Sequence, residues 1–162
     1  MVLGAEDFAD CRLSVQRITE ILGCGTFSED RVWDPLRNSA LIELVICLRD
    51  LLWKADHYGV RVAFTDDVMA NAYVKDVTDA VTAVRDACCH IDSFKKLFDK
   101  SGNRGAFITV SKTRGMAAVT LGGVSLRNDY EDDTAFFFGP NRLYLRRHIV
   151  RAFGEARRNL GM

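Results

Sequence analysis

Apolar residues recur every three or four positions along several stretches of the chain, which is the pattern of α-helices with one face against a core. The first predicted helix covers residues 5–22. The second begins at Asp34, a predicted N-cap followed by Pro35, and runs to about His57. Its residues are apolar on nearly every side, so this helix must be covered either by the rest of the protein or by a second subunit.

A third predicted helix carries the clearest apolar stripe in the sequence. We expect it to begin at Thr65, as the N-cap before two aspartates, and to end near Ile91. The residues of its stripe are three or four positions apart: Val74, Val77, Val81, Val84, Cys88 and Ile91. Residues 92–100 are expected to continue as a short helical turn, and a last helix is predicted at about residues 145–160.

Residues 103–144 show the period of strands instead of helices. Turn residues separate five short apolar runs, which predict antiparallel strands: residues 107–110, 118–121, 124–126, 135–138 and 143–145. The acidic run at residues 129–133 is expected at the tip of a loop.

Because 162 residues suit one core, we expect a single domain over residues 1–162. Its predicted fold is mainly α, a four-to-five-helix up-and-down bundle with a small antiparallel β insertion at residues 103–144, before the last helix.

Composition and charge exclude several kinds of function. Lys plus Arg equals Asp plus Glu at 22 each, so no overall charge attracts the protein to nucleic acid or to a membrane. No signal-like or membrane-spanning segment is evident, and the five cysteines include no CxxC pair, which favours a reduced, cytoplasmic protein. Cys88 and Cys89 are expected as small core residues, because no other residues with metal-ligand spacing surround them. We therefore expect no metal and no cofactor.

Polar side chains gather where the third predicted helix ends. Asp86 and His90 are four residues apart and share a face, and Arg85 lies on the neighbouring face, beside the apolar stripe. An arginine followed by a histidine four to six residues later often arises by chance, and Arg142 with His148 also fits this spacing. Three features favour the first pair: the acid after its arginine, its place at a helix end, and a preceding helix that needs a further partner.

At this point the sequence resembles a known family. Arg85, Asp86 and His90 are similar to the R-polar-x3-H motif of HEPN-domain proteins. These proteins are helical bundles and commonly metal-independent endoribonucleases of toxin–antitoxin, abortive-infection and CRISPR systems. The resemblance covers residues 34–92 and the last helix, and it leaves residues 103–144 as an insertion.

The resemblance implies an endoribonuclease that cleaves RNA by attack of the 2′-hydroxyl and leaves a cyclic phosphate. Arg85 would stabilise charge on the phosphate, His90 would transfer protons, and Asp86 would orient His90 or favour its charged form. The family further implies a homodimer in which two motifs form one site. It also suggests a toxin or phage-defence role, with an antitoxin or another regulatory protein as a partner.

Further basic residues are candidates for RNA binding. Arg147, Arg151 and Arg158 lie opposite the apolar stripe of the last helix, and Lys95 and Lys96 face outward on the short helical turn. The three arginines are equally well explained as an ordinary solvated helix surface.

Each functional interpretation has a structural alternative. Arg85 and His90 can simply interact with free carbonyls and the dipole at a helix C-terminus. His57 and His148 are expected to be structural. Among other functions, the sequence allows a non-catalytic HEPN-like module that binds RNA, a nucleotide or a partner protein. A third alternative is a structural protein that docks through its strand insertion.

Overall fold

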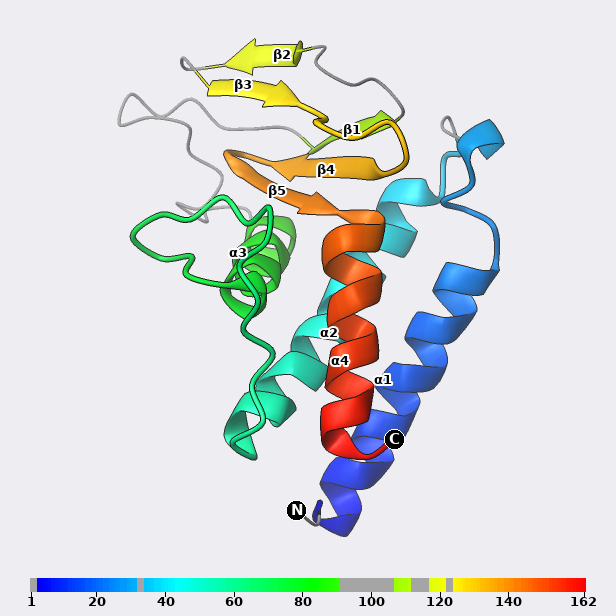
Figure 1. Cartoon of the computed structure of the whole chain (residues 1–162). Helices are drawn as coiled ribbons and strands as arrows, with labels where there is room; N and C mark the ends of the chain where they lie inside the picture. The colour runs from blue at the N-terminus through cyan, green and yellow to red at the C-terminus, as the bar shows by residue number, and fades with distance from the viewer. Residues whose placement is uncertain (1–2, 32–33, 91–106, 112–116, 122–123) are drawn as a thin grey trace.

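The computed structural model describes residues 3–31, 34–90, 107–111, 117–121 and 124–162 (Figure 1). Four α-helices lie within these ranges, together with a short 3-10 turn at Glu29–Arg31 and a π-helical segment at Leu145–Val150 that leads into the last helix: α1 (Ala5–Gly23), α2 (Arg37–His57), α3 (Val77–Cys89) and α4 (Arg151–Leu160). The strands are β1 (Phe107–Ser111), β2 (Ala117–Leu121), β3 (Val124–Arg127), β4 (Thr134–Phe138) and β5 (Asn141–Tyr144). The described chain is therefore mainly helical, with antiparallel strands before the last helix, as the sequence predicts.

Helix α2 is the centre of the helical layer and packs against α1, α3 and α4. Its inward side chains are fully buried, as the apolar pattern of this helix predicts: Leu41, Leu44, Val45, Leu48, Leu51, Leu52 and Ala55. Helices α1 and α2 run antiparallel, and the buried Lys54 ties them together through Nζ contacts of 3.0 Å to Asp10 Oδ2 and 3.2 Å to Asp7 Oδ1. Helix α3 is strongly foreshortened in Figure 1, whereas α4 runs down the picture, so the axes of these two helices are not parallel.

The strands form a layer at one end of the helices (Figure 1). β4 lies between β1 and β5 in a three-stranded antiparallel sheet, and β2 pairs with β3 in a separate hairpin. Every residue of β4 is buried. Phe136 and Phe138 belong to the core shared with the helices, while Phe137 packs with Tyr144 and with Leu126 of β3. The sheet therefore lies between the helices and the β2–β3 hairpin, which explains why β4 is apolar at four consecutive positions.

The third helix begins later than the sequence predicts. α3 starts at Val77, and its N-cap is Asp76, whose carboxylate accepts a hydrogen bond of 3.0 Å from the Asp79 backbone N–H. Residues 60–76 form an irregular segment instead, in which Asp67 adopts a left-handed conformation with φ of 59°. The prediction of an N-cap at Thr65 is wrong, because the left-handed residue interrupts a helix and Asp76 provides a better start.

Candidate functional site

Arg85, Asp86 and His90 lie together at the C-terminal end of α3. Arg85 Nη1 is 3.2 Å from Asp86 Oδ1 and 3.4 Å from His90 Nε2. The side chains of Arg85 and Asp86 are 32% and 25% exposed, and His90 is exposed. The predicted catalytic residues are therefore neighbours in space, and solvent reaches them.

The end of the helix explains how residues five apart can touch. His90 is the first residue after α3, and its extended backbone (φ −116°, ψ 112°) turns the chain away from the helix. Its N–H still donates a 3.0 Å hydrogen bond to the carbonyl oxygen of Asp86. This bond anchors the backbone of His90 to the last helical turn, on the side where Arg85 lies.

The contact with Arg85 sets which edge of the His90 ring faces the guanidinium. Because a guanidinium can only donate hydrogen bonds, Nε2 of His90 is the acceptor in this contact. The Asp86 carboxylate contacts Arg85 while its carbonyl oxygen holds the His90 backbone, so Asp86 positions both partners.

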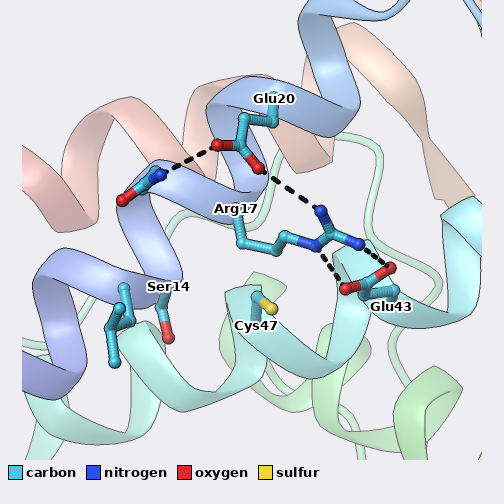
Figure 2. A pocket seen from close by; sticks show the side chains of 7 residues that line it. Ser14, Arg17, Glu20, Glu43 and Cys47 are labelled. Atoms are coloured by element: carbon cyan, nitrogen blue, oxygen red, sulfur yellow. Dashed lines mark hydrogen bonds and ion pairs between the residues drawn. The ribbon is translucent and has the colours of Figure 1, made fainter.

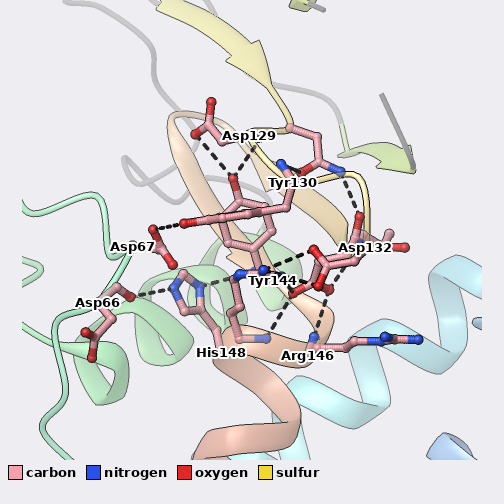
Figure 3. A network of polar contacts seen from close by, with 12 residues as sticks. Asp66, Asp67, Asp129, Tyr130, Asp132, Tyr144, Arg146 and His148 are labelled. Carbon is pink, nitrogen blue, oxygen red and sulfur yellow. Dashed lines mark hydrogen bonds and ion pairs between the residues drawn. The ribbon is translucent and has the colours of Figure 1, made fainter. Parts of the chain in front are cut away.

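In the second arginine–histidine match, His148 is held by other partners, as Figure 3 shows. His148 is fully buried, its Nδ1 accepts a 3.2 Å bond from the Tyr144 N–H, and its Nε2 lies 3.0 Å from the Asp66 carbonyl oxygen. Burial lowers the pKa of His148. Arg142 instead contacts Asp129 at 2.6 Å and lies over the Tyr144 ring. These contacts support the structural role predicted for His148.

Two of the arginines predicted to bind RNA are already engaged with carboxylates. Arg147 contacts Asp132 at 3.0 Å and Asp133 at 3.2 Å. Arg151 contacts both Asp66 and Glu155 at 2.9 Å. Phosphate binding by either arginine must compete with these ion pairs.

The other residues predicted to bind RNA differ in what the structure describes. Arg158 is exposed on α4. Lys95 and Lys96 lie outside the described residues, as does the short helical turn expected at residues 92–100.

Asp133 belongs to the acidic run predicted at the tip of a loop, and it does lie in the turn between β3 and β4, but its side chain is fully buried. Its carboxylate accepts hydrogen bonds from the backbone N–H groups of Arg146 at 2.9 Å and Arg147 at 3.0 Å. It therefore caps the helical segment that follows β5. The sequence predicts the loop but not the burial of Asp133, because a cap from thirteen positions upstream leaves no local signal in the sequence.

A groove of about 350 Å³ lies between α1 and α2 (Figure 2). The residues that line it all precede α3 in the sequence. Its residues are Leu13, Ser14, Gln16, Arg17, Glu20, Glu43 and Cys47. Arg17 spans the groove and contacts both Glu43 and Glu20, the latter at 3.3 Å. One guanidinium thus faces two carboxylates, so this ion-paired cluster keeps an excess of negative charge.

Two further findings concern the described residues as a group. They include no group of three or more His, Cys, Asp or Glu side chains that could hold a metal ion. Among the helices described, none has the length and apolar character needed to cross a membrane.

Comparisons of the chain with protein-family models, with curated proteins and with solved structures found no match.

Proposed function

We propose that this protein is a metal-independent endoribonuclease of the HEPN type that acts as a homodimer. The observation that carries the proposal is the 3.4 Å contact between Arg85 Nη1 and His90 Nε2 at a solvent-exposed helix end. Phosphodiester cleavage by the 2′-hydroxyl requires a group that transfers protons and a positive charge beside the phosphate, and an imidazole next to a guanidinium can supply both. The same proposal covers the fold, in which the helices form the bundle of that family and the strands are an insertion.

The chemistry assigns one role to each side chain. When a phosphate binds, Arg85 exchanges its contact with His90 for two phosphate oxygens, which frees Nε2. Nε2 then takes the proton of the 2′-hydroxyl, the 2′-oxygen attacks phosphorus, and the bond from phosphorus to the 5′-oxygen breaks. A protonated histidine gives its proton to the 5′-oxygen, so the products are a 2′,3′-cyclic phosphate and a 5′-hydroxyl.

The need for both a base and an acid explains why a dimer is proposed. One chain offers a single histidine at this site, whereas two chains that meet near their α3 ends offer one imidazole to accept a proton and another to donate one. Asp86 holds Arg85 between turnovers through its 3.2 Å contact. Arg158, and Arg147 and Arg151 once released from their carboxylates, would bind the RNA backbone.

A cleavage assay on a mixed RNA pool tests this function. Wild type, His90→Ala and the control His57→Ala are incubated with RNA in excess EDTA, and product ends are identified. His57 suits the control because it is an exposed histidine at the end of α2 that stacks on Trp53 of the same helix. We expect cyclic phosphate ends from wild type and His57→Ala, and a loss of about 10²-fold or more in His90→Ala. Equal cleavage by all three proteins would exclude His90.

A non-catalytic HEPN-like module that binds RNA, a nucleotide or a partner protein is the second candidate function. It is favoured over the ribonuclease by the ion pairs of Arg147 and Arg151 and by the zero net charge, because both reduce the positive charge available to RNA. In the same assay such a module would produce no new RNA ends, in wild type and variants alike, whether or not it binds the labelled RNA.

The proposal includes a toxin or phage-defence role, which a growth assay addresses. Expression of the wild type should slow bacterial growth, whereas expression of His90→Ala to the same level should not. Equal growth with both proteins would remove the toxin role and leave the enzymatic proposal to the cleavage assay.

A further inference from the structure

The segment that precedes α3 contacts an arginine that is proposed to bind RNA. Residues 60–76 form no helix or strand, and part of this segment faces the π-helical segment (Figure 3). The Arg151 guanidinium lies over the Phe64 ring, with Cζ 3.8 Å from the ring centroid, and its Nη1 is 2.9 Å from Asp66 Oδ2. The segment therefore supplies both a ring beneath this guanidinium and a carboxylate at its edge. We call residues 64–67 the acidic strap.

Two further contacts hold the acidic strap in place. Oδ1 of Asp67 accepts a 2.5 Å hydrogen bond from the Tyr130 hydroxyl. The Asp66 carbonyl oxygen lies 3.0 Å from His148 Nε2. Asp67 has a left-handed backbone with φ of 59°, and a residue other than glycine keeps such a conformation only where its surroundings hold it. The bond from Tyr130 therefore helps to keep the strap on Arg151.

The Asp66 carboxylate competes directly with a phosphate. An arginine binds carboxylate and phosphate oxygens through the same N–H groups at the edge of its guanidinium. The side chains of Arg151 and Asp66 are 42% and 69% exposed, so a phosphate can reach this ion pair from solvent. While the pair is closed, Nη1 of Arg151 is directed at the strap instead of at RNA.

The two acids that contact Arg151 differ in how they can be removed. Glu155 contacts Nε at 2.9 Å from one turn further along the same helix, so it accompanies Arg151 wherever α4 moves. Asp66 is 85 residues earlier in the chain and belongs to a segment with no regular structure. Displacement of that segment would remove the carboxylate and the Phe64 ring together.

We propose that the acidic strap is an autoinhibitory contact, which keeps Arg151 from RNA until the strap is displaced. In the closed state Asp66 holds Nη1 of Arg151. In the open state Nη1 is released, and Arg151 binds a phosphate of the RNA backbone. This inference deepens the proposed function by naming a regulation of its RNA-binding surface, and it rests on that function.

RNA binding by strap variants tests the proposal. A labelled single-stranded RNA is titrated by fluorescence, with every protein carrying His90→Ala to prevent cleavage. Asp66→Asn removes the competing charge, whereas Tyr130→Phe removes the bond to Asp67 and leaves the charge of the chain unchanged. Both variants should bind RNA about threefold more tightly or better, because no ion pair must first be broken. The salt dependence should also steepen, by about 0.7 in log–log slope for each chain that gains a phosphate contact.

Asp56→Asn is the matched control. Asp56 has a 46% exposed side chain and pairs with a different arginine, Arg61, at 2.6 Å. The substitution changes the net charge as Asp66→Asn does, but it leaves the strap intact, so RNA affinity should stay within about twofold of the parent. Adding Arg151→Gln to either strap variant should abolish the gain. An equal gain in Asp56→Asn, or no gain in Asp66→Asn or in Tyr130→Phe, would overturn the strap.

The outcomes separate this inference from the proposed function. If the wild type cleaves RNA in EDTA but the strap variants bind RNA no more tightly than their parent, the strap is wrong and the ribonuclease stands. If the strap variants bind RNA more tightly and the wild type cleaves none, the strap stands and the ribonuclease is wrong. Failure of every variant to bind RNA would overturn the strap, whatever the cleavage assay shows.

Discussion

His148 shows how a single buried side chain can make stability depend on pH. Its ring accepts a bond from the Tyr144 N–H and lies 3.0 Å from the Asp66 carbonyl oxygen, and it has no contact with solvent. A second ring proton would displace the Tyr144 N–H from Nδ1 and place a charge in the core. Burial accordingly lowers the pKa of this histidine from its ordinary value.

The direction of the pH effect follows from that shift. Below the ordinary histidine pKa of about 6.5, the unfolded chain binds a proton at this position while the folded chain does not. The free energy of unfolding should therefore fall as the pH is lowered from 7.5 to 5, and His148→Gln should reduce this dependence. Urea unfolding at several pH values checks the prediction, with the exposed His57→Gln as the control. An unchanged pH dependence in His148→Gln would contradict it.

At the scale of single residues, the sequence identifies the candidate site but not its contacts. The motif spacing groups Arg85, Asp86 and His90, and the structure places them together. The sequence could not show that the Asp86 carboxylate contacts Arg85. Which of several neighbouring groups a side chain contacts depends on where the helix ends. Nor could it show that Arg147 and Arg151 are paired, since the carboxylates of Asp132 and Asp66 come from distant segments.

The last helical element depends on a cap from outside its own sequence. Asp133 accepts two backbone N–H groups at the start of the π-helical segment and contacts the Arg147 guanidinium at 3.2 Å. Asp133→Ala should lower the free energy of unfolding by about 2–3 kcal/mol, because it removes the cap and leaves buried donors without a partner. Denaturant unfolding measures this loss.

A neighbouring acid provides the control for that prediction. Asp132 also contacts Arg147, but its side chain is 64% exposed, so Asp132→Ala should cost less than about 1 kcal/mol. If the two variants were equally stable, the role of Asp133 as a cap would be wrong.

The sequence predicts where an element lies when the spacing of its apolar residues and its capping or turn residues indicate the same boundaries. The first helix, predicted at residues 5–22, is α1 at Ala5–Gly23, and the predicted strands match β1 to β5 within one or two residues. The second helix begins at Arg37 rather than beside Pro35, because Asp34 closes a turn by accepting the Leu36 N–H. The late start of α3 could not be predicted in the same way. It depends on the left-handed backbone of Asp67, which cannot be inferred from helix propensity.

Across the whole molecule, equal numbers of positive and negative residues limit how strongly RNA can be held. Few arginines can reach phosphate without first breaking an ion pair to another element. Those proposed to do so are chiefly Arg85 and Arg158 of each chain. Four such contacts in a dimer predict a slope of about −3 for log binding constant against log salt concentration with single-stranded RNA. Fluorescence titration of a labelled RNA with His90→Ala gives this slope without cleavage. A slope near zero would contradict the assignment of the RNA-binding residues, whereas one near −6 would mean that Arg147 and Arg151 also leave their carboxylates and bind phosphate.

The central claim is that His90 activates a 2′-hydroxyl beside Arg85, and one measurement tests it most directly. A defined RNA is cleaved by wild type in excess EDTA, and the same RNA is then made with a single 2′-deoxynucleotide on the 5′ side of the mapped cut. We predict that cleavage at that bond disappears while neighbouring cuts persist, and that His90→Ala cleaves the unmodified RNA at least about 10²-fold more slowly. Cleavage of the deoxy-substituted bond at the wild-type rate would contradict the account.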